Sequence, residues 1–322
     1  MNYRRNAGDV NAARFLEPDA GHTGATIPGA GPSYQRGPRS TGGHSGTWRS
    51  QPWSRYVAIG DSFTAGVGDP EPLSPGGMRG WADRVAEELG ESHGDFGYAN
   101  LAISGLVLRD ILDQQLGPAL SLKPDLVTLS AGGNDLVFHR GDPDRLAAAL
   151  DDAVVALSAT GATVVLFTGP DWGETAVLGH IRGKVAVFNE NLRVIATRHN
   201  SVVADLWALR QLSDPRMWDP DRLHFSPLGH HTIASMVLDA LSVQHTLRPL
   251  EPRPMPPGNW RETRAGDLAW VAHYMLPWMV GRIRPRADTP PRQAKRPLPG
   301  PPPASPGGGP GPTPLVRPGS VG

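Results

Sequence analysis

Residues 56–64 read Tyr-Val-Ala-Ile-Gly-Asp-Ser-Phe-Thr, an apolar run followed at once by small and polar residues. The apolar run predicts a short buried strand, and the glycine after it predicts a turn. Ser62 therefore stands where a strand ends and a loop begins. This position makes Ser62 the best nucleophile candidate in the chain.

Similar apolar runs recur along the chain, and longer segments with helical spacing separate them. We predict strands at residues 56–59, 98–103, 126–130, 164–168 and 202–206, and helices at 81–89, 107–120, 144–159, 184–199 and 227–241. Most of these strands are apolar on both faces, which is typical of a parallel sheet covered by helices on both sides. The sequence therefore predicts one α/β domain, a three-layer α/β/α sandwich around a five-stranded parallel sheet.

Composition divides the chain into a structured middle and two ends of different character. Residues 1–52 are rich in Gly, Ser, Thr and Pro, and residues 285–322 are dominated by Pro and Gly. We expect both ends to be disordered tails, because such segments offer little apolar surface for a core. The predicted domain covers residues 53–245, and an extension with an amphipathic helix is expected at 246–284.

The extension has apolar residues at helical spacing over residues 259–284, with arginines at its flanks. An arginine-flanked aromatic helix could rest on a membrane surface. Such a stripe more often packs against its own domain, and Pro277 would bend the helix in either case. We therefore favour packing over peripheral membrane contact.

Charge and composition argue against several classes of protein. The chain has 31 basic and 31 acidic residues, a net charge of +0 and no cysteine. We therefore expect no nucleic-acid partner, no disulfide and no thiolate zinc site. No HExxH motif or comparable cluster indicates a metal, and no cofactor is expected. Neither a secretory signal nor a run of about 18 apolar residues is found, so we expect a cytoplasmic protein.

Three further polar motifs accompany the Ser62 segment: Ser104-Gly105, Gly132-Gly133-Asn134-Asp135 and Asp221-Arg222-Leu223-His224. Each follows a predicted strand or precedes the last predicted helix. In open α/β sheets, functional groups gather at the carboxyl ends of the strands. The motifs are therefore candidates for a single site.

Together with Gly60-Asp61-Ser62, these motifs resemble the four sequence blocks of the SGNH hydrolase superfamily, the GDSL-type esterases and lipases, in the family's order. The resemblance covers residues 53–245, and Phe63 replaces the leucine of the name-giving motif. It implies a flavodoxin-like fold and a serine hydrolase that cleaves carboxylic esters through an acyl-enzyme intermediate. The implied substrate is a small-molecule or lipid ester.

A serine hydroxyl needs a base within hydrogen-bond reach to attack an ester efficiently. We predict His224 as the base of Ser62 and Asp221 as the carboxylate that orients its ring. An ordinary loop histidine is the competing interpretation. Four other histidines are assigned weaker roles: His230 and His231 are predicted to be structural, and His139 and His180 are weaker candidates for substrate contact.

By the same resemblance, three donors would stabilise the oxyanion: the backbone N–H groups of Ser62 and Gly105 and the side-chain amide of Asn134. An ordinary turn glycine and a local Asx-turn are the competing interpretations of Gly105 and Asn134. We expect Asp61 and Asp135 to hydrogen-bond neighbouring loop amides rather than take part in chemistry.

The main alternative is a flavodoxin-like module that binds a small molecule or phosphate at the loop of residues 60–68 without hydrolysing it. It shares the predicted fold. Neither a P-loop motif nor a strand-linked G-x-G-x-x-G is present, and this alternative leaves Asn134, Asp221 and His224 unexplained. A G-x-S-x-G elbow is also missing, which argues against the other large serine-esterase fold.

Overall fold

The computed structural model describes residues 52–91, 94–173, 178–250 and 293–303. Nearly all of the predicted N-terminal tail, the stretch 259–284 with its predicted amphipathic helix, and residues 304–322 lie outside the described residues. No helix in the described ranges is long and apolar enough to cross a bilayer.

The sheet has six strands in the order β5-β4-β3-β1-β2-β6. Their bounds are β1 Arg55–Gly60, β2 Gly97–Asn100, β3 Leu126–Ser130, β4 Thr163–Phe167, β5 Val202–Ala204 and β6 Arg296–Gly300. The first five are parallel, and their order 2-1-3-4-5 is that of flavodoxin-like folds. The predicted parallel sheet is thus confirmed, with one strand more than expected.

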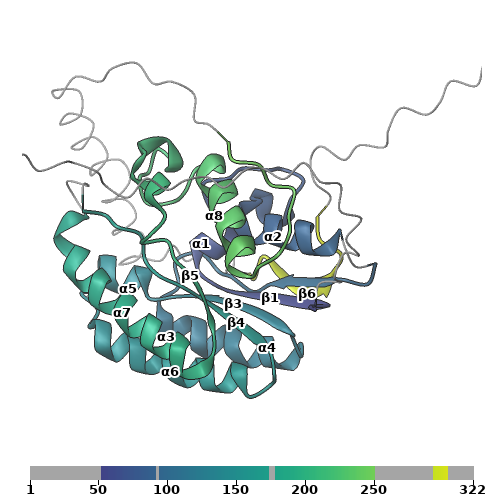
Figure 1. The fold of residues 1–322 in the computed structure, drawn as a ribbon, viewed down its shortest axis with the longest axis horizontal. Coiled ribbons are helices and arrows are strands. Elements are labelled where there is room, and N and C mark those ends of the chain that lie inside the picture. The colour runs from purple at the N-terminus through teal and green to yellow at the C-terminus, as the bar shows by residue number, and fades with distance from the viewer. Residues whose placement is uncertain (1–51, 92–93, 174–177, 251–292, 304–322) are drawn as a thin grey trace, which may run out of the picture. The chain divides into compact units, whose positions relative to one another are not determined.

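The sixth strand corrects the prediction for the C-terminal tail. β6 lies within residues 285–322, which were expected to be disordered, yet it pairs antiparallel with β2 at the sheet edge. Its sequence is Arg-Pro-Leu-Pro-Gly, and prolines are tolerated on an edge strand because only one side of the strand has to pair. The pairing is irregular between Tyr98 and Asn100. Figure 1 shows β6 in yellow at this edge.

The helices fill the connections between the strands, as predicted (Figure 1). Their bounds are α1 Ser62–Ala65, α2 Gly80–Gly90, α3 Leu108–Ile111, α4 Gly117–Ser121, α5 Gly133–Phe138, α6 Pro143–Ser158, α7 Arg182–His199 and α8 Pro227–Ala240. A π-helical segment, Leu112–Leu116, joins α3 to α4, so the helix predicted at 107–120 is continuous but irregular.

Local sequence sets the starts of two long predicted helices, α6 and α8. Asp142 accepts hydrogen bonds from the first backbone amides of α6, and Pro143 occupies the first turn. Ser226 caps α8 in the same way and is also followed by proline. Side-chain capping of otherwise unpaired amides explains why these helices begin where the sequence indicated.

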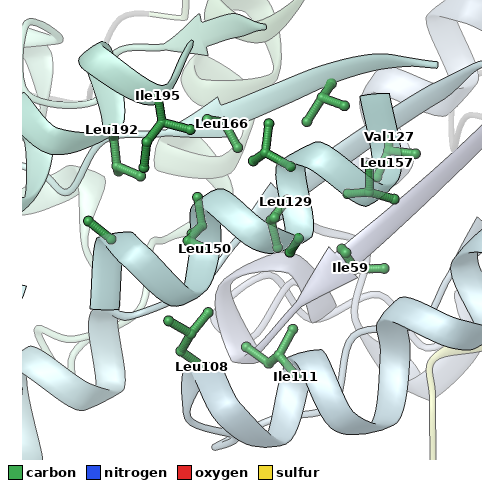
Figure 2. Close-up of a cluster of buried hydrophobic side chains, with 14 of the residues drawn as sticks. Ile59, Leu108, Ile111, Val127, Leu129, Leu150, Leu157, Leu166, Leu192 and Ile195 are labelled. Atoms are coloured by element: carbon green, nitrogen blue, oxygen red, sulfur yellow. The ribbon is translucent and has the colours of Figure 1, made fainter. Parts of the chain in front are cut away.

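The core consists of two apolar layers, one on each face of the sheet. Val57 and Ile59 of β1 face the layer made with α3, α6 and α7, whereas Tyr56 and Ala58 face the layer made with α2 and α8. Figure 2 shows the first layer, where Leu150 of α6 lies among the strand side chains. Both faces of β1 are therefore covered, as its continuous apolar run predicted.

Candidate active site

Ser62 is the first residue of α1, directly after β1 and the Gly60-Asp61 turn. The Asp61 carboxylate caps this short helix by accepting a hydrogen bond from the Phe63 amide at 3.0 Å. A Cβ atom at Gly60 would lie 2.7 Å from the Ser130 carbonyl oxygen of β3. Glycine at position 60 therefore lets β1 run close to β3 while the next turn presents Ser62 at the end of the sheet.

His224 reaches Ser62 from the loop before α8. Its Nε2 atom lies 2.9 Å from the Ser62 Oγ atom, and its Nδ1 atom lies 2.5 Å from Asp221 Oδ2. The other Asp221 oxygen accepts hydrogen bonds from the Leu223 and His224 amides, each at 2.9 Å. The structure thus joins a hydroxyl, an imidazole and a carboxylate in one hydrogen-bonded line.

Asp221 is held in its charged form. Burial alone would raise the pKa of its carboxyl, but the hydrogen bond and charge of His224 and the two backbone donors bring that pKa below its usual value. An ionised carboxylate accepts the Nδ1 proton of the imidazole. This arrangement leaves Nε2 free to accept a proton from Ser62.

Close packing between two loops fixes the Ser62–His224 approach. Gly68, in the loop after α1, has a left-handed φ of 96°, and a Cβ atom there would overlap the Phe225 carbonyl oxygen. Phe225 forms an isolated antiparallel bridge with Trp218, and the Asp219 amide donates to the His224 carbonyl at 2.9 Å. The turn that carries His224 is therefore closed by its own backbone and lies against the loop that follows the nucleophile.

Asn134 lies in the first turn of α5, beside the nucleophile turn. Its Nδ2 atom donates to the Leu106 carbonyl at 2.8 Å and to Asp61 Oδ2 at 3.1 Å. The amide bridges two segments that are distant in sequence, which a local Asx-turn would not do. Both of its N–H groups are donated within the protein, so an oxyanion at this site has to replace one of these two acceptors.

Gly105 lies in the loop between β2 and α3 and has a φ of 79°, a left-handed conformation that favours glycine. The Asp135 carboxylate accepts a hydrogen bond from the Leu108 amide at 2.9 Å and so ties this loop to α5. Asp61 and Asp135 therefore accept from backbone amides, but these amides belong to the first turns of α1 and α3 rather than to loops.

Asp61 is buried between these elements, and its environment opposes its charge. Burial, together with the nearby charge of Asp135, raises the pKa of Asp61 to about 6, despite the opposing effects of the Phe63 amide and of His224. The carboxyl group that holds both α1 and Asn134 thus titrates close to neutral pH.

A cavity of about 120 Å³ opens beside Ser62, Asn134 and His224. Its remaining walls are mainly apolar and aromatic, and include Phe138, Phe167, Trp172, Phe188, Leu206 and Trp218. Sequence reasoning missed this lining, because its residues come from several loops and helices and share no local spacing. The predicted substrate-contact candidates His139 and His180 are not among the lining residues.

The two histidines of α8 lie away from the reacting line. His230 is fully buried: its Nδ1 atom accepts from the Trp81 amide at 3.2 Å, and its Nε2 atom donates to the Val67 carbonyl at 3.0 Å. Burial lowers the pKa of His230 to about 4, so the ring is neutral. His231 lies 2.8 Å from the Arg248 carbonyl oxygen. These contacts are structural, in agreement with the sequence analysis.

The described ranges contain no group of three or more histidine, aspartate or glutamate residues placed to hold a metal ion.

Comparison with known proteins identifies the family. The model of the GDSL-like Lipase/Acylhydrolase family matches residues 58–232, more than half of the chain. The protein belongs to the GDSL-like lipase/acylhydrolase family. The resemblance inferred from the four motifs is therefore confirmed, and the matched residues include Ser62, Gly105, Asn134, Asp221 and His224.

A curated relative matches a short part of this GDSL-like protein. Lipase 1 from Streptomyces coelicolor is 38% identical over 84 residues, which are 26% of this chain and 31% of that protein. The chain thus matches about a third of the length of this curated relative.

Solved structures with low sequence identity are similar to this GDSL-like protein. Axe2, an acetylxylan esterase from Geobacillus stearothermophilus, is 22% identical with a TM-score of 0.50 and covers 59% of this chain and 95% of its own. TesA is 21% identical with a TM-score of 0.49, covering 58% and 97% respectively.

Proposed function

We propose that this protein hydrolyses carboxylic esters through a covalent acyl-enzyme intermediate. The observation that carries the proposal is the hydrogen-bonded line from Ser62 Oγ through the His224 ring to Asp221, at 2.9 and 2.5 Å. Membership of the GDSL-like lipase/acylhydrolase family supports the same chemistry.

In the first half of the reaction, Ser62 Oγ attacks the ester carbonyl carbon while His224 Nε2 takes the hydroxyl proton. Asp221 keeps the other imidazole proton on Nδ1 and stabilises the imidazolium. The tetrahedral intermediate then expels the alcohol, which receives the proton from His224. In the second half, water attacks the acyl-enzyme with His224 again as the base, and Ser62 regains its proton as the acid leaves.

The negative charge that develops on the carbonyl oxygen needs donors already in place. We assign this role to the backbone N–H groups of Ser62 and Gly105 and to the Asn134 amide. Asn134 contributes once one of its N–H groups moves from Asp61 Oδ2, the longer of its two hydrogen bonds, to the oxyanion.

The walls of the cavity favour an apolar acyl group over a sugar. They are aromatic and aliphatic, and the volume of about 120 Å³ is close to the ~150 Å³ of an apolar cavity that holds benzene. An acyl group of the size of butyryl or benzoyl fits this space, whereas a long fatty chain would have to extend beyond it. We therefore propose esters of short or aromatic acids as substrates.

The alternative of a phosphate-binding module is not favoured by the site. α1 has four residues, and its N-terminus is already capped by the Asp61 carboxylate. A phosphate would have to displace, or lie beside, a buried acidic group.

A panel of p-nitrophenyl esters tests the proposal. We expect kcat/KM to be higher for butyrate than for acetate or palmitate, and an acetylated xylo-oligosaccharide to be a poor substrate. Ser62→Ala should lower kcat by about 10⁶-fold. Equal hydrolysis by the wild type and by Ser62→Ala would refute the mechanism, and a preference for the acetylated sugar would refute the assigned substrate class.

A further inference from the structure

Lys295, just before β6, enters the interior of the domain. Its side chain is 4% exposed, and its Nζ atom lies 2.8 Å from Asp83 Oδ2 of α2 and donates to the Arg79 carbonyl at 2.7 Å. The Asp83 side chain is 2% exposed. A buried ion pair is weak evidence of added stability, because the cost of desolvating both charges offsets their attraction. Added stability therefore does not explain why Lys295 and Asp83 are buried together.

Asp83 continues a hydrogen-bonded path toward the nucleophile helix. Its Oδ1 atom accepts from the Tyr98 hydroxyl at 2.8 Å. The Asn100 Nδ2 atom donates to that hydroxyl and to the Thr64 carbonyl, each at 3.0 Å. Thr64 belongs to α1, the four-residue helix that begins with Ser62. A path of buried polar groups thus joins Lys295 to the element that carries the nucleophile.

The segment of residues 295–302, which begins with Lys295 and includes β6, also contacts the loop that leads to Gly105. The Lys295 amide donates to the Ala102 carbonyl at 3.3 Å. The Ala102 amide in turn donates to Asn100 Oδ1 at 3.1 Å, so every polar atom of the Asn100 side chain is engaged. Asn100 therefore holds α1 with its amide nitrogen and the residue 101–105 loop with its amide oxygen.

Further contacts hold the segment in place. Arg296 lies over the Tyr98 ring at 5.7 Å, and a Cβ atom at Gly90 of α2 would overlap the Pro302 ring. Lys295 is not among the residues that line the cavity beside Ser62. Lys295 therefore acts on the site through the elements that it contacts rather than by touching the cavity.

We infer that Lys295 is a positioning residue for the active site, supplied by a segment outside the family-matched residues 58–232. Through Asp83, Tyr98 and Asn100 it holds α1 and the residue 101–105 loop, and with them Ser62 and the Gly105 amide, in the reactive geometry. The expected effect on catalysis rests on the proposed function. The effect of Lys295 on the position of α1 and the residue 101–105 loop does not.

Lys295→Met tests the inference, because methionine keeps an unbranched apolar chain as far as Cε and removes the charged ammonium group. Lys184→Met is the matched control: Lys184 is an exposed lysine that also donates to backbone carbonyls, those of Arg140 and Gly141. The double variant Lys295→Met with Asp83→Asn removes the unpaired carboxylate and still offers an acceptor to Tyr98. It keeps the test decisive if the single variant does not fold.

Two quantities are measured at a temperature where each variant is fully folded. We expect kcat on p-nitrophenyl butyrate to fall at least tenfold with KM within twofold of the wild type. We expect amide hydrogen exchange to be at least tenfold faster in peptides covering residues 61–67 and 101–106, and unchanged in α7. Lys184→Met should match the wild type in both measurements.

Exchange rates in these peptides equal to the wild type, or an unchanged kcat despite faster exchange, would overturn the inference. If the wild type hydrolyses no ester, the proposed function fails. In that case the exchange data still decide whether Lys295 holds α1 and the residue 101–105 loop, so the two failures are distinguishable.

Discussion

The Nε2 atom of His224 lies 2.9 Å from the Oγ atom of Ser62, although 162 positions separate the two residues in the sequence. The parallel sheet brings them together, because the loop before α8 lies at the carboxyl end of the strands, where β1 also ends. The tight contact of the Gly68 loop with the Phe225 carbonyl then sets the distance between their loops.

Asp221→Asn should lower kcat by about 10⁴-fold while leaving the fold intact. An amide oxygen can still accept from the Leu223 and His224 backbone, but it cannot stabilise an imidazolium as a carboxylate does. Asp219→Asn is the control: Asp219 lies in the same turn and accepts from the Asp221 amide at 3.4 Å, whereas Asp221 is the carboxylate that lies 2.5 Å from the His224 ring. Steady-state kinetics and a thermal melt measure both effects. Retention of more than a tenth of wild-type kcat by Asp221→Asn would contradict the assigned role.

Asn134→Ala should lower kcat by about 10²–10³-fold with little change in KM, because an oxyanion donor acts in the transition state rather than in the ground state. Asn191→Ala, which removes an amide that donates to Asp144 on the exposed side of α7, serves as the control. Steady-state kinetics on a short-chain ester measure both. A change confined to KM would show that Asn134 binds substrate without stabilising the oxyanion.

His230 should make the stability of the fold depend on pH in a defined window. Its pKa is about 4 in the folded protein and 6.5 in the reference state, so the folded state favours the neutral ring. Its contribution is complete above pH 6.5 and is lost as the pH falls toward 4, amounting to about 3 kcal/mol at most. His230→Gln should reduce the loss of unfolding free energy between pH 7 and pH 4.5, as measured by urea denaturation. An identical pH dependence in the variant would rule out this assignment.

Gly68→Ala should impair both stability and activity. The new Cβ atom would overlap the Phe225 carbonyl oxygen and would strain a φ of 96°. Gly161→Ala separates the two effects, because Gly161 has a φ of 83° and open space around it. We expect Gly161→Ala to cost about 1–2 kcal/mol and to leave kcat unchanged. Gly68→Ala should cost more and also lower kcat, measured by urea denaturation and steady-state kinetics. Equal effects of the two variants would show that the Gly68–Phe225 contact does not position the site.

The elements that could be predicted from the sequence are those whose causes are local. The apolar run of β1 and the Asp142 cap of α6 each depend on neighbouring residues, so their positions are readable from the chain alone. The four motifs could also be predicted to lie close together, because each follows a strand or precedes the last helix, and the carboxyl ends of parallel strands lie on the same side of the sheet.

The features that could not be predicted from the sequence depend on contacts between residues that are distant in the chain. Nothing near Arg296 indicates a strand, since the segment is rich in proline and its partner strand lies about two hundred positions away. The burial of Lys295 beside Asp83 and the aromatic walls of the cavity have the same origin. The composition of residues 285–322 predicts the behaviour of an isolated segment. Pairing with β2 makes residues 296–300 a strand.

Covalent labelling with a fluorophosphonate probe, followed by mass spectrometry of the peptide that contains Ser62, tests whether Ser62 is the nucleophile. We expect a single phosphonylated serine at position 62 in the wild type, no label in Ser62→Ala, and much slower labelling in His224→Ala. Labelling at another residue, equal labelling of Ser62→Ala, or no labelling of the folded wild type would contradict this role of Ser62.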